Sequence, residues 1–306
     1  MKLSIVIPTR WDWNMQNMIM CLSAQSFKDF EVIFVVDKNL KEEGEFRSSD
    51  PRITFMTNLN SDFRSKRDVN DPRIWGNASE LRNYGITSAK GEFILLMDDD
   101  EWFEDDYLHN YLLLWEKYRK IVWQDFVLCP TLMYRKTGHV QNYWFSHFDY
   151  CMSRPVAADM GNHEWIDVQM YSWNSLLAPT YIFQDHLFDE RLDFVTEDLD
   201  FTRGISYAGI PILVLRDLKI YHMGRDKNAL EQARVWNEYS AYRKAKHRIL
   251  FVKKYWSFSN KLMFFLLWLR WQPLRLALKV LLYGKGSPRR KIIKALRKGS
   301  RDGLSA

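Results

Sequence analysis

The stretch from Gly91 to Trp102 constrains the fold of this chain more than any other part of the sequence. Phe93 to Met97 form an unbroken apolar run, which is typical of a short strand buried on both faces of a parallel sheet. Asp98, Asp99 and Asp100 follow directly, where such a strand would leave the sheet. In open α/β sheets ligands bind at the carboxyl ends of strands, so we expect chemistry at these aspartates.

The spacing of the aspartates indicates a metal site. Alternate residues of an extended segment point the same way, so we expect Asp98 and Asp100 to converge on one ligand while Asp99 turns aside. Two convergent carboxylates suit Mg²⁺ or Mn²⁺, with a phosphate completing the coordination. The alternative is a solvated acidic turn that caps a helix predicted from about Glu104. The buried strand before the turn favours the metal site.

Two earlier strands and the helix between them predict a parallel sheet. Leu3–Pro8 and Glu31–Val36 have the composition of buried strands, and the apolar spacing of Asn14–Gln25 predicts a crossover helix. A strand, a helix and a second strand form a βαβ unit, which requires parallel pairing. Thr9 and Asp37 then lie at the carboxyl ends of the two strands.

A helix at Gly76–Ile86 leads directly into the aspartate strand. Its apolar positions leave Arg82 and Asn83 partly off the core face. Arg82 is either an ordinary surface arginine or a phosphate ligand. The other expected elements are a strand at Ile53–Met56, a helix at Tyr107–Tyr118, a hairpin of Phe126–Arg135 with Val140–Phe145, a strand at Ser175–Phe183, a helix from Thr196 to about Gly209, and strands at Ile212–Leu215 and Leu218–Tyr221.

Acidic residues also open the helix that begins near Thr196. Thr196 is expected as the N-cap, with Glu197 and Asp198 in the first turn. Complementarity to the helix dipole alone would explain these two acids, so the local pattern leaves a catalytic role open. His222 follows the last strand, and a lone histidine there is more often structural than catalytic.

The charge of the chain is divided between two regions. The net charge is +6, but residues 239–306 contain 18 Lys or Arg against one acid, Asp302, which gives +17 there and −11 in the remainder. Ala229–Trp256 is predicted to be a long basic helix. The apolar run Leu262–Leu269 is too short to cross about 30 Å of hydrocarbon. An acidic body and a basic, apolar tail predict two kinds of surface with two kinds of partner.

We expect residues 229–306 to lie on an anionic membrane surface. Aromatic and Leu side chains would enter the lipid while cations meet the head groups, helped by an amphipathic turn of Ile292, Ile293 and Leu296. A basic tail would also suit nucleic-acid phosphates. The apolar Leu-Phe-Trp block does not fit a phosphate-binding surface, so no nucleic acid is expected. The remaining alternative is that the apolar face packs on the protein itself or on a second subunit, which would make the chain a homo-oligomer.

Composition limits the class of protein. A chain of 306 residues that is 47% hydrophobic and 15% aromatic is long enough and apolar enough for a proper core. Cys21, Cys129 and Cys151 form no paired spacing, which fits a reducing compartment without a disulfide framework or zinc site. The N-terminus begins directly with a strand-like run. We therefore expect a cytoplasmic protein that associates peripherally with the inner face of the membrane.

Together these segments resemble the family 2 glycosyltransferases, which have the A-type nucleotide-sugar-binding fold. The matching segments occur in the family's order across residues 1–225: Ser4–Pro8, Glu31–Asp37, Gly76–Gly85, Gly91–Trp102, Phe188–Glu190 and Thr196–Asp198. The resemblance implies a Rossmann-like α/β fold with a mostly parallel central sheet flanked by helices. It implies a catalytic domain over residues 1–228, with nucleotide-sugar binding in about 1–102 and the acceptor half in about 103–228. The amphipathic helical tail has no fixed counterpart in the family.

The resemblance implies donor-binding roles for the first group of residues. Asp37 would bind the nucleobase in a pocket lined by the Pro8–Thr9 turn, and Arg82 would approach the nucleotide. Asp98 would hold the ribose or the metal shell, with Asp99 beside it in the donor site. Asp37 is followed by Lys-Asn and not by the usual second acid with Gly-Ser, and the connection after it is long, which leaves the identity of the donor open.

The resemblance implies metal-binding and catalytic roles for the second group. Asp100 would bind a divalent cation, Mn²⁺ or Mg²⁺, on the donor diphosphate, together with Asp98 and, as a further ligand, His222. Asp198 would be the general base, with Glu197 beside it. The implied activity is inverting transfer of a sugar from a nucleoside-diphosphate donor to a hydroxyl of a glycan or lipid-linked acceptor, in cell-surface polysaccharide synthesis.

Two other classes of function remain as alternatives. A sugar-phosphate nucleotidyltransferase would also place acids at the end of a parallel strand. It would normally carry a Gly- and Lys/Arg-rich loop after the first strand, where this chain has Pro-Thr-Arg-Trp. A non-catalytic glycan- or lipid-binding protein could keep the fold without the base, whereas Asp98, Asp100 and Asp198 are all present here.

Overall fold

The chain forms two compact units. The computed structural model describes residues 1–9, 15–36, 48–57, 77–135, 137–140, 144–149, 154–172, 175–192, 196–223, 238–255, 257–262, 264–266 and 289–306. The first unit comprises Met1–His147 and Ala157–Gly224, and the second comprises Phe148–Val156 and Arg225–Ala306. The second unit thus includes residues 148–156, which the sequence placed in the catalytic domain.

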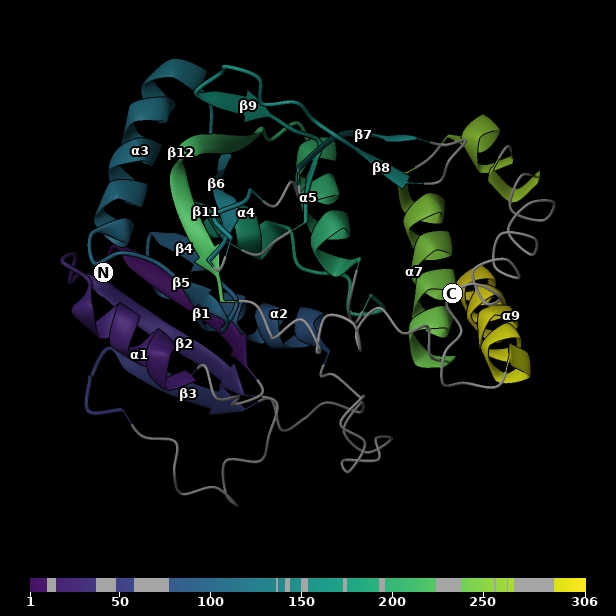
Figure 1. The fold of residues 1–306 in the computed structure, drawn as a ribbon, viewed down its shortest axis with the longest axis horizontal. Coiled ribbons are helices and arrows are strands. Elements are labelled where there is room, and N and C mark those ends of the chain that lie inside the picture. Colours follow the sequence, from purple (N-terminus) through teal and green to yellow (C-terminus); the bar gives the residue numbers. More distant parts are fainter. Residues whose placement is uncertain are drawn as a thin grey trace. The chain divides into compact units, whose positions relative to one another are not determined.

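The sheet of the first unit begins with the predicted parallel strands (Figure 1). Its order is β3-β2-β1-β4-β11-β6-β12-β5, with β9 paired to β12. The parallel strands are β1 (Leu3–Thr9), β2 (Phe30–Val36), β3 (Ile53–Thr57) and β4 (Phe93–Leu96). Helix α1 (Met15–Ala24) connects β1 to β2 and buries Met15, Met18 and Leu22. The predicted βαβ unit is confirmed.

Helix α2 (Ala78–Ser88) packs against β1 and β2 through a glycine. A Cβ atom at Gly85 would lie 2.3 Å from Cγ1 of Val6 and 3.1 Å from Cγ2 of Val35. Since real Cβ contacts are longer, only glycine allows the helix to approach the strands this closely. At the start of the helix, the side chain of Asn77 accepts a hydrogen bond from the backbone of Glu80.

Beyond β4 the sheet is mixed. Strand β11 (Leu176–Pro179) pairs antiparallel with both β4 and β6 (Val127–Tyr134), while β12 (Ile212–His222) runs parallel to β6. The sequence predicted one strand over Ser175–Phe183, but the chain leaves the sheet after Pro179 and forms α4 (Thr180–Asp185). A short apolar run does not distinguish a buried strand from a buried helix, which explains the error.

Of the hairpin predicted after residue 126, the described residues show a bridge near its turn. Met133 and Val140 make an isolated antiparallel bridge. Strand β7 (Trp144–Asp149) instead joins a three-stranded sheet in the order β10-β7-β8, with β10 at Met170–Tyr171 and β8 at Arg154–Ala157. Trp144 pairs with Tyr171 and both are buried in the core, so burial of these rings decides where β7 pairs.

The remaining elements of the first unit flank β12 and cover the sheet. Strands β5 (Glu101–Trp102) and β9 (Trp165–Asp167) pair antiparallel with opposite ends of β12. Helix α3 (Tyr107–Val122) is one turn longer than predicted and ends at Trp123, which has a left-handed φ of 60°. Helix α5 (Glu197–Tyr207) begins after Thr196, its predicted N-cap, although the side chain of Thr196 makes no capping hydrogen bond.

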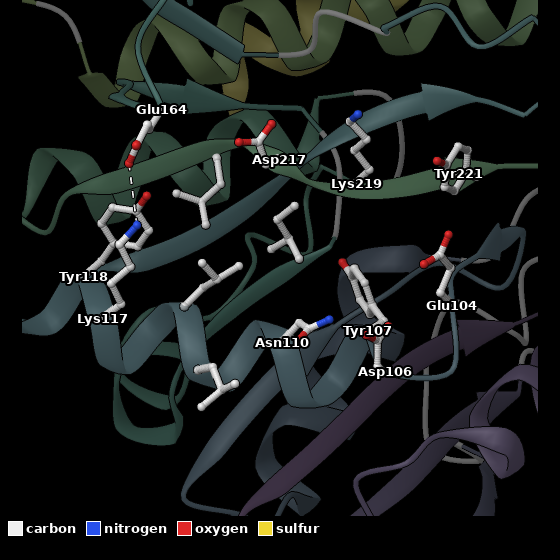
Figure 2. Close-up of a pocket in the computed structure, with 14 residues that line it drawn as sticks. Glu104, Asp106, Tyr107, Asn110, Lys117, Tyr118, Glu164, Asp217, Lys219 and Tyr221 are labelled. Carbon is white, nitrogen blue, oxygen red and sulfur yellow. Dashed lines mark ion pairs between the residues drawn. The ribbon is translucent and has the colours of Figure 1, made fainter.

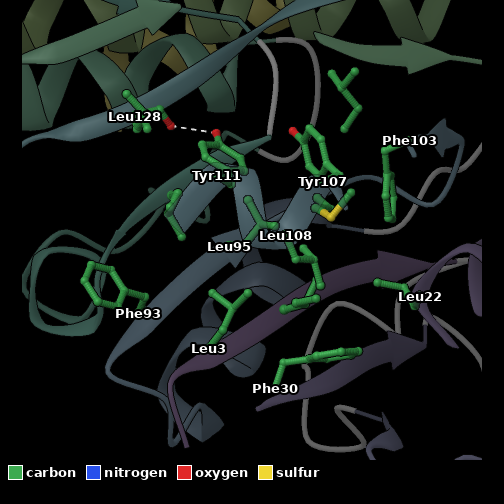
Figure 3. Packing of buried hydrophobic residues seen from close by; sticks show 14 of the residues in the cluster. Leu3, Leu22, Phe30, Phe93, Leu95, Phe103, Tyr107, Leu108, Tyr111 and Leu128 are labelled. Carbon is green, nitrogen blue, oxygen red and sulfur yellow. Dashed lines mark hydrogen bonds between the residues drawn. The ribbon is translucent and has the colours of Figure 1, made fainter. Parts of the chain in front are cut away.

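The core lies on both faces of the large sheet. One cluster is shared with α1 and α3 and includes Leu3, Leu95, Leu108 and Tyr111 (Figure 3). The hydroxyl of Tyr111 donates to the carbonyl of Leu128 at 2.8 Å, which satisfies a polar group inside the cluster. The other cluster is shared with α4 and α5. Burial on both faces explains why β1, β2 and β4 are almost wholly apolar.

In the second unit, α7 (Glu238–Tyr255) and α9 (Arg289–Ser305) lie side by side (Figure 1). Residues 229–237 and 256 of the predicted long helix lie outside the described residues. Leu296 is buried, and Gly299 and Gly303 face the backbone of α7. Among the described residues, none of the helices has the length and apolar character needed to cross a membrane.

Candidate active site

The three aspartates form a turn and not an extended segment. Strand β4 ends at Leu96, and the chain turns at Asp99 and Asp100 before β5 begins at Glu101. The alternation of side chains along a strand therefore does not apply here, and the predicted convergence of Asp98 and Asp100 on that ground is not observed. Each aspartate instead has its own partner from a different part of the chain.

Arg82 of α2 joins the aspartate turn to the first turn of α5. Its guanidinium lies 2.9 Å from the carboxylate of Asp98 and 3.4 Å from that of Glu197. Arg82 is only 4% exposed, so the prediction that it lies partly off the core face is wrong. Burial alone would lower the pKa of Arg82, but the carboxylates of Asp98 and Glu197 outweigh it and raise that pKa.

A neighbouring residue on α2 explains why that face is covered. The side-chain amide of Asn83 donates to the carbonyl of Phe188 at 2.9 Å and accepts from the backbone N–H of Phe188 at 2.8 Å. It also donates to Glu190 at 3.0 Å. Asn83 therefore fixes the Phe-Asp-Glu segment over α2, and it is 7% exposed, contrary to the prediction. The signal in the sequence for this contact was that both segments, Gly76–Gly85 and Phe188–Glu190, match the same family.

Asp198 lies in the first turn of α5 beside Glu197. The hydroxyl of Ser172 donates to one carboxylate oxygen of Asp198 at 3.0 Å, and the backbone N–H of Leu199 donates to the other at 2.8 Å. Burial, followed by the charge of Glu197, raises the pKa of Asp198 to about 7. A carboxyl with a pKa near neutrality can accept a proton from a substrate and release it again at physiological pH.

Glu197 is more deeply buried than Asp198. It is 5% exposed, and one of its carboxylate oxygens faces Arg82. The other oxygen is buried and has no hydrogen-bond partner among the described residues. A buried, paired carboxylate is costly to move, so Glu197 is suited to hold Arg82 in place more than to meet a substrate.

Asp100 and His222 are brought together although 122 positions separate them in the sequence. Nε2 of His222 lies 3.0 Å from a carboxylate oxygen of Asp100, and the backbone N–H of Met223 donates to the carbonyl of Asp100 at 2.8 Å. Both side chains are partly exposed. Among the residues that the structure describes, no group of three or more His, Cys, Asp or Glu side chains is arranged to hold a metal ion.

Thr9 and Asp99 form the third contact of the turn. The hydroxyl of Thr9, at the end of β1, donates to the carboxylate of Asp99 at 2.6 Å. Pro8 precedes it inside β1, which extends one residue further than predicted. Asp37, predicted to bind the nucleobase, lies outside the described residues.

We use one name, the carboxylate centre, for the group formed by Asp98, Asp99, Asp100, Glu197 and Asp198, with Arg82 and His222.

Sequence reasoning missed one carboxylate that supports this centre. Glu101 is 3% exposed, and the hydroxyl of Ser175 lies 3.2 and 3.1 Å from its two carboxylate oxygens. Glu101 also accepts from the backbone N–H of Asp98 at 3.3 Å and pairs with His222 between β5 and β12. Glu101 therefore holds the turn of the three aspartates in position. Its position directly after the aspartates was the only signal in the sequence.

A pocket of about 710 Å³ lies between α3 and β12 (Figure 2). Lys117 of α3 and Glu164 form an ion pair at 3.6 Å at its edge. Tyr221 lines the pocket, while the next residue, His222, contacts Asp100. We assign the pocket no part in the reaction proposed below.

The fold and the site together define the class of protein. A sheet flanked by helices carries acidic residues at the end of a parallel strand, and Arg82 joins one of them to an acidic pair on a later helix. This is the organisation expected of an A-type nucleotide-sugar glycosyltransferase fold.

Comparison with known proteins supports the resemblance to the family. The model of the glycosyl transferase family 2 domain matches residues 67–166. Over 129 residues the chain is 26% identical to glycosyltransferase GlyA of Streptococcus pneumoniae serotype 4, covering 40% of this chain and 15% of GlyA. Over 118 residues it is 31% identical to the amylovoran biosynthesis glycosyltransferase AmsB of Erwinia amylovora, covering 36% of this chain and 35% of AmsB. The match therefore spans well under two thirds of either relative.

Solved structures show the same fold. Residues 1–349 of TarS from S. aureus, in complex with UDP-GlcNAc, align with a TM-score of 0.57 and 17% identity, covering 98% of this chain and 80% of TarS. The same TarS fragment in complex with UDP aligns with a TM-score of 0.53 and 18% identity, again covering 98% of this chain and 80% of that one. At this level of identity the likeness concerns the fold alone.

Proposed function

We propose that this chain is an inverting, metal-dependent glycosyltransferase that moves a sugar from a nucleoside-diphosphate donor to a hydroxyl of a glycan or lipid-linked acceptor. The observation that carries the proposal is the Arg82 bridge, because it joins Asp98 at the end of β4 to Glu197 beside Asp198. Donor-side and acceptor-side carboxylates thereby meet in one centre. The family match over residues 67–166 supports the proposal.

Asp198 is the proposed general base. An acceptor hydroxyl is far too weak an acid to ionise at neutral pH, so its proton must pass to a base as its oxygen attacks. The pKa of Asp198, raised to about 7, makes its carboxylate a stronger base than an ordinary aspartate. Ser172 and the backbone of Leu199 hold the carboxylate in position.

The proposed reaction is a single displacement. The acceptor oxygen forms a bond to the anomeric carbon, the bond from that carbon to the diphosphate oxygen breaks, and the nucleoside diphosphate leaves with the electron pair. The acceptor proton goes to Asp198. Attack opposite the leaving group inverts the anomeric centre, so the reaction needs no covalent intermediate with the protein.

Asp100 and His222 are the proposed ligands of a divalent cation. A carboxylate oxygen and an imidazole nitrogen are both ligands that Mn²⁺ accepts. The two groups lie 3.0 Å apart, so both would be within reach of one cation. When bound, such a cation neutralises the negative charge that develops on the leaving diphosphate. The neighbouring Asp98 is held by Arg82, so we assign it to orient the turn and the donor ribose.

The donor is proposed to be a UDP-sugar, and the acceptor a growing polysaccharide. The TarS fragment with the same fold is in complex with UDP-GlcNAc and with UDP, which supports uridine as the base. AmsB is by name a glycosyltransferase of amylovoran biosynthesis, which supports a polysaccharide acceptor. Thr9 and Asp99, at the end of β1, lie on the donor side of the centre.

The experiment is a donor panel with the full chain. Nucleoside diphosphate release is measured with UDP-, GDP- and TDP-sugars in Mn²⁺, in Mg²⁺ and after chelation. We expect one UDP-sugar to be turned over with a metal present, and we expect Asp100→Ala to abolish this turnover. The matched control is Asp105→Ala, which removes an exposed acid five positions later and should leave turnover within about twofold.

Other outcomes would replace the proposal. Release of pyrophosphate from a nucleoside triphosphate and a sugar phosphate would identify a nucleotidyltransferase. Nucleotide-sugar binding without release, even with polysaccharide acceptors present, would identify a non-catalytic binding protein. If metal-dependent turnover is unchanged in Asp100→Ala, the cation is bound by ligands other than Asp100.

A further inference from the structure

Helix α9 presents one face to α7 and another to solvent. Leu296 is 7% exposed, and a Cβ atom at Gly299 would lie 2.2 Å from the carbonyl oxygen of Tyr242. At Gly303 a Cβ atom would lie 2.8 Å from the carbonyl oxygen of Lys246. The small and apolar face of α9 is therefore occupied by α7, and the amphipathic turn predicted to enter lipid is partly used inside the protein.

The opposite side of α9 is basic. Its exposed cations, which we call the α9 cation face, are Lys291, Lys294, Arg297, Lys298 and Arg301. Several of them are spaced by three or four residues, which places them on one side of a helix. The single acid after residue 239, Asp302, accepts a hydrogen bond from the hydroxyl of Tyr242 at 2.7 Å, so it is turned toward α7.

A second exposed surface in the same unit is apolar. Phe258, Leu262 and Leu266 are 83%, 51% and 55% exposed, and we call them the apolar row. They lie in the helical residues 258–262 and 264–266. Phe264 is 2% exposed and packs with Ile249 of α7.

We propose that the second unit binds the surface of an anionic lipid bilayer, with the α9 cation face meeting the head groups and the apolar row entering the acyl boundary. Charge complementarity favours this partner, because the cations are exposed and the only acid of α9 faces α7. A row of large exposed apolar side chains is costly in water and is the feature that lipid, unlike a nucleic acid, would cover. The inference is independent of the proposed reaction.

The two surfaces differ in their response to salt. Each cation near an anionic leaflet is expected to raise partitioning about fivefold, and salt screens this term. Burial of the apolar row is not screened. Binding should therefore weaken as salt rises and persist in part, with the persistent fraction due to the apolar row.

The experiment is co-sedimentation of the full chain with vesicles of phosphatidylcholine alone or with phosphatidylglycerol. At about 0.1 M salt we expect binding to the anionic vesicles that falls, without vanishing, at about 0.5 M. Lys294→Gln with Arg297→Gln and Arg301→Gln should lower low-salt binding about a hundredfold. The matched control, Lys28→Gln with Lys90→Gln and Lys120→Gln, changes the net charge equally at exposed sites of the first unit and should leave binding unchanged.

The apolar row is tested in the same way. Leu262→Ser with Leu266→Ser should remove the binding that persists at high salt. The matched control is Leu113→Ser with Ile121→Ser, because these first-unit residues are 54% and 50% exposed and should leave vesicle binding unchanged. Circular dichroism establishes that each variant is folded before its binding is compared.

Three results would overturn the proposal. The first is a full-length chain that stays in the supernatant with anionic vesicles at low salt, or matched controls that lower binding as much as the test variants. The second is a dimer in light scattering that Leu262→Ser with Leu266→Ser converts to monomer while vesicles are ignored, since a second copy would then cover the row. The third is binding of an oligonucleotide, but not of vesicles, that the α9 variants abolish.

Discussion

The carboxylate centre and the α9 cation face use charge in opposite ways. In the centre, Arg82 is 4% exposed and lies between two carboxylates, so its charge is enclosed and matched. On α9, Arg297 and its neighbours are exposed. A buried charge left without its partner bears the full cost of desolvation, whereas an exposed one is hydrated and screened. The same residue type should therefore carry very different energetic weight in the two places.

Replacement of Arg82 by alanine should have the largest effect on stability. It would leave Asp98 and Glu197 beside an empty site, with Glu197 buried and charged, and should lower the free energy of unfolding by about 3–5 kcal/mol. Urea denaturation of the full chain measures this difference. If the free energy of unfolding falls by less than about 1 kcal/mol, the Arg82 ion pairs contribute no more to stability than a surface ion pair does.

Replacement of Asp198 by asparagine should give the largest effect on catalysis. The amide keeps the size of the side chain but cannot accept the acceptor proton, so turnover should fall by about 10²-fold or more while donor binding is kept. Single-turnover kinetics and nucleotide titration separate the two. If Asp198→Asn stays active and Glu197→Gln is inactive, the general base is Glu197 and the assignment of the base to Asp198 is wrong by one position.

In the second unit, Gly299→Ala should have the next largest effect. In an exposed helix this change stabilises by about 1 kcal/mol, because alanine is the better helix former. Here the added Cβ would meet the backbone of Tyr242, so we expect a loss of about 1–3 kcal/mol. Thermal unfolding followed by circular dichroism gives the sign. The neighbouring Ser300→Ala is the control, and equal effects of the two changes would argue against close packing of α7 and α9.

The pH dependence of kcat/KM should report the environment of Asp198. The base must be ionised, so activity should rise with pH, reach half its plateau near pH 7 and fall about tenfold per unit below that. The hydroxyl of Ser172 stabilises the ionised form and lowers the pKa of Asp198, so Ser172→Ala should move the midpoint upward. A midpoint near that of an ordinary aspartate would contradict the assignment.

Replacement of Arg297 by alanine should have the smallest effect on stability. An exposed cation away from caps and cores contributes within about 0.5 kcal/mol, and added salt should reduce that further. The same urea titration used for Arg82→Ala provides the comparison. A loss approaching that of Arg82→Ala would show that α9 uses its cations inside the fold and would break the contrast between the two regions.

The sequence by itself determined the elements whose signal is local. The apolar run before the aspartates, the spacing of α1 and the composition of β2 predicted a βαβ unit with acids at a strand end, and the structure has that arrangement. The imbalance of charge after residue 239 was also readable directly. Burial periodicity and charge are properties of neighbours in the chain, so they need no knowledge of the packing.

Local signals failed where packing decides between similar outcomes. The apolar residues at 175–183 could form a strand or a helix, and the chain divides them between β11 and α4. Arg82 and Asn83 were expected at the edge of the core because α2 alone shows only its own apolar face. The segment from Phe188 to Glu190 covers that face, and nothing within α2 indicates it.

The tertiary structure alone decided the partners of the charged groups. Asp100 meets His222 from 122 positions away and Glu101 meets Ser175, because the sheet places β4 beside β11 and β5 beside β12. Asp198 of α5 meets Ser172. On α9 it decided which face was already occupied. The sequence specifies which residues must be buried or solvated. The partner of a charged group depends on which elements the strand order brings to the same edge of the sheet. Strand order is a property of the whole core.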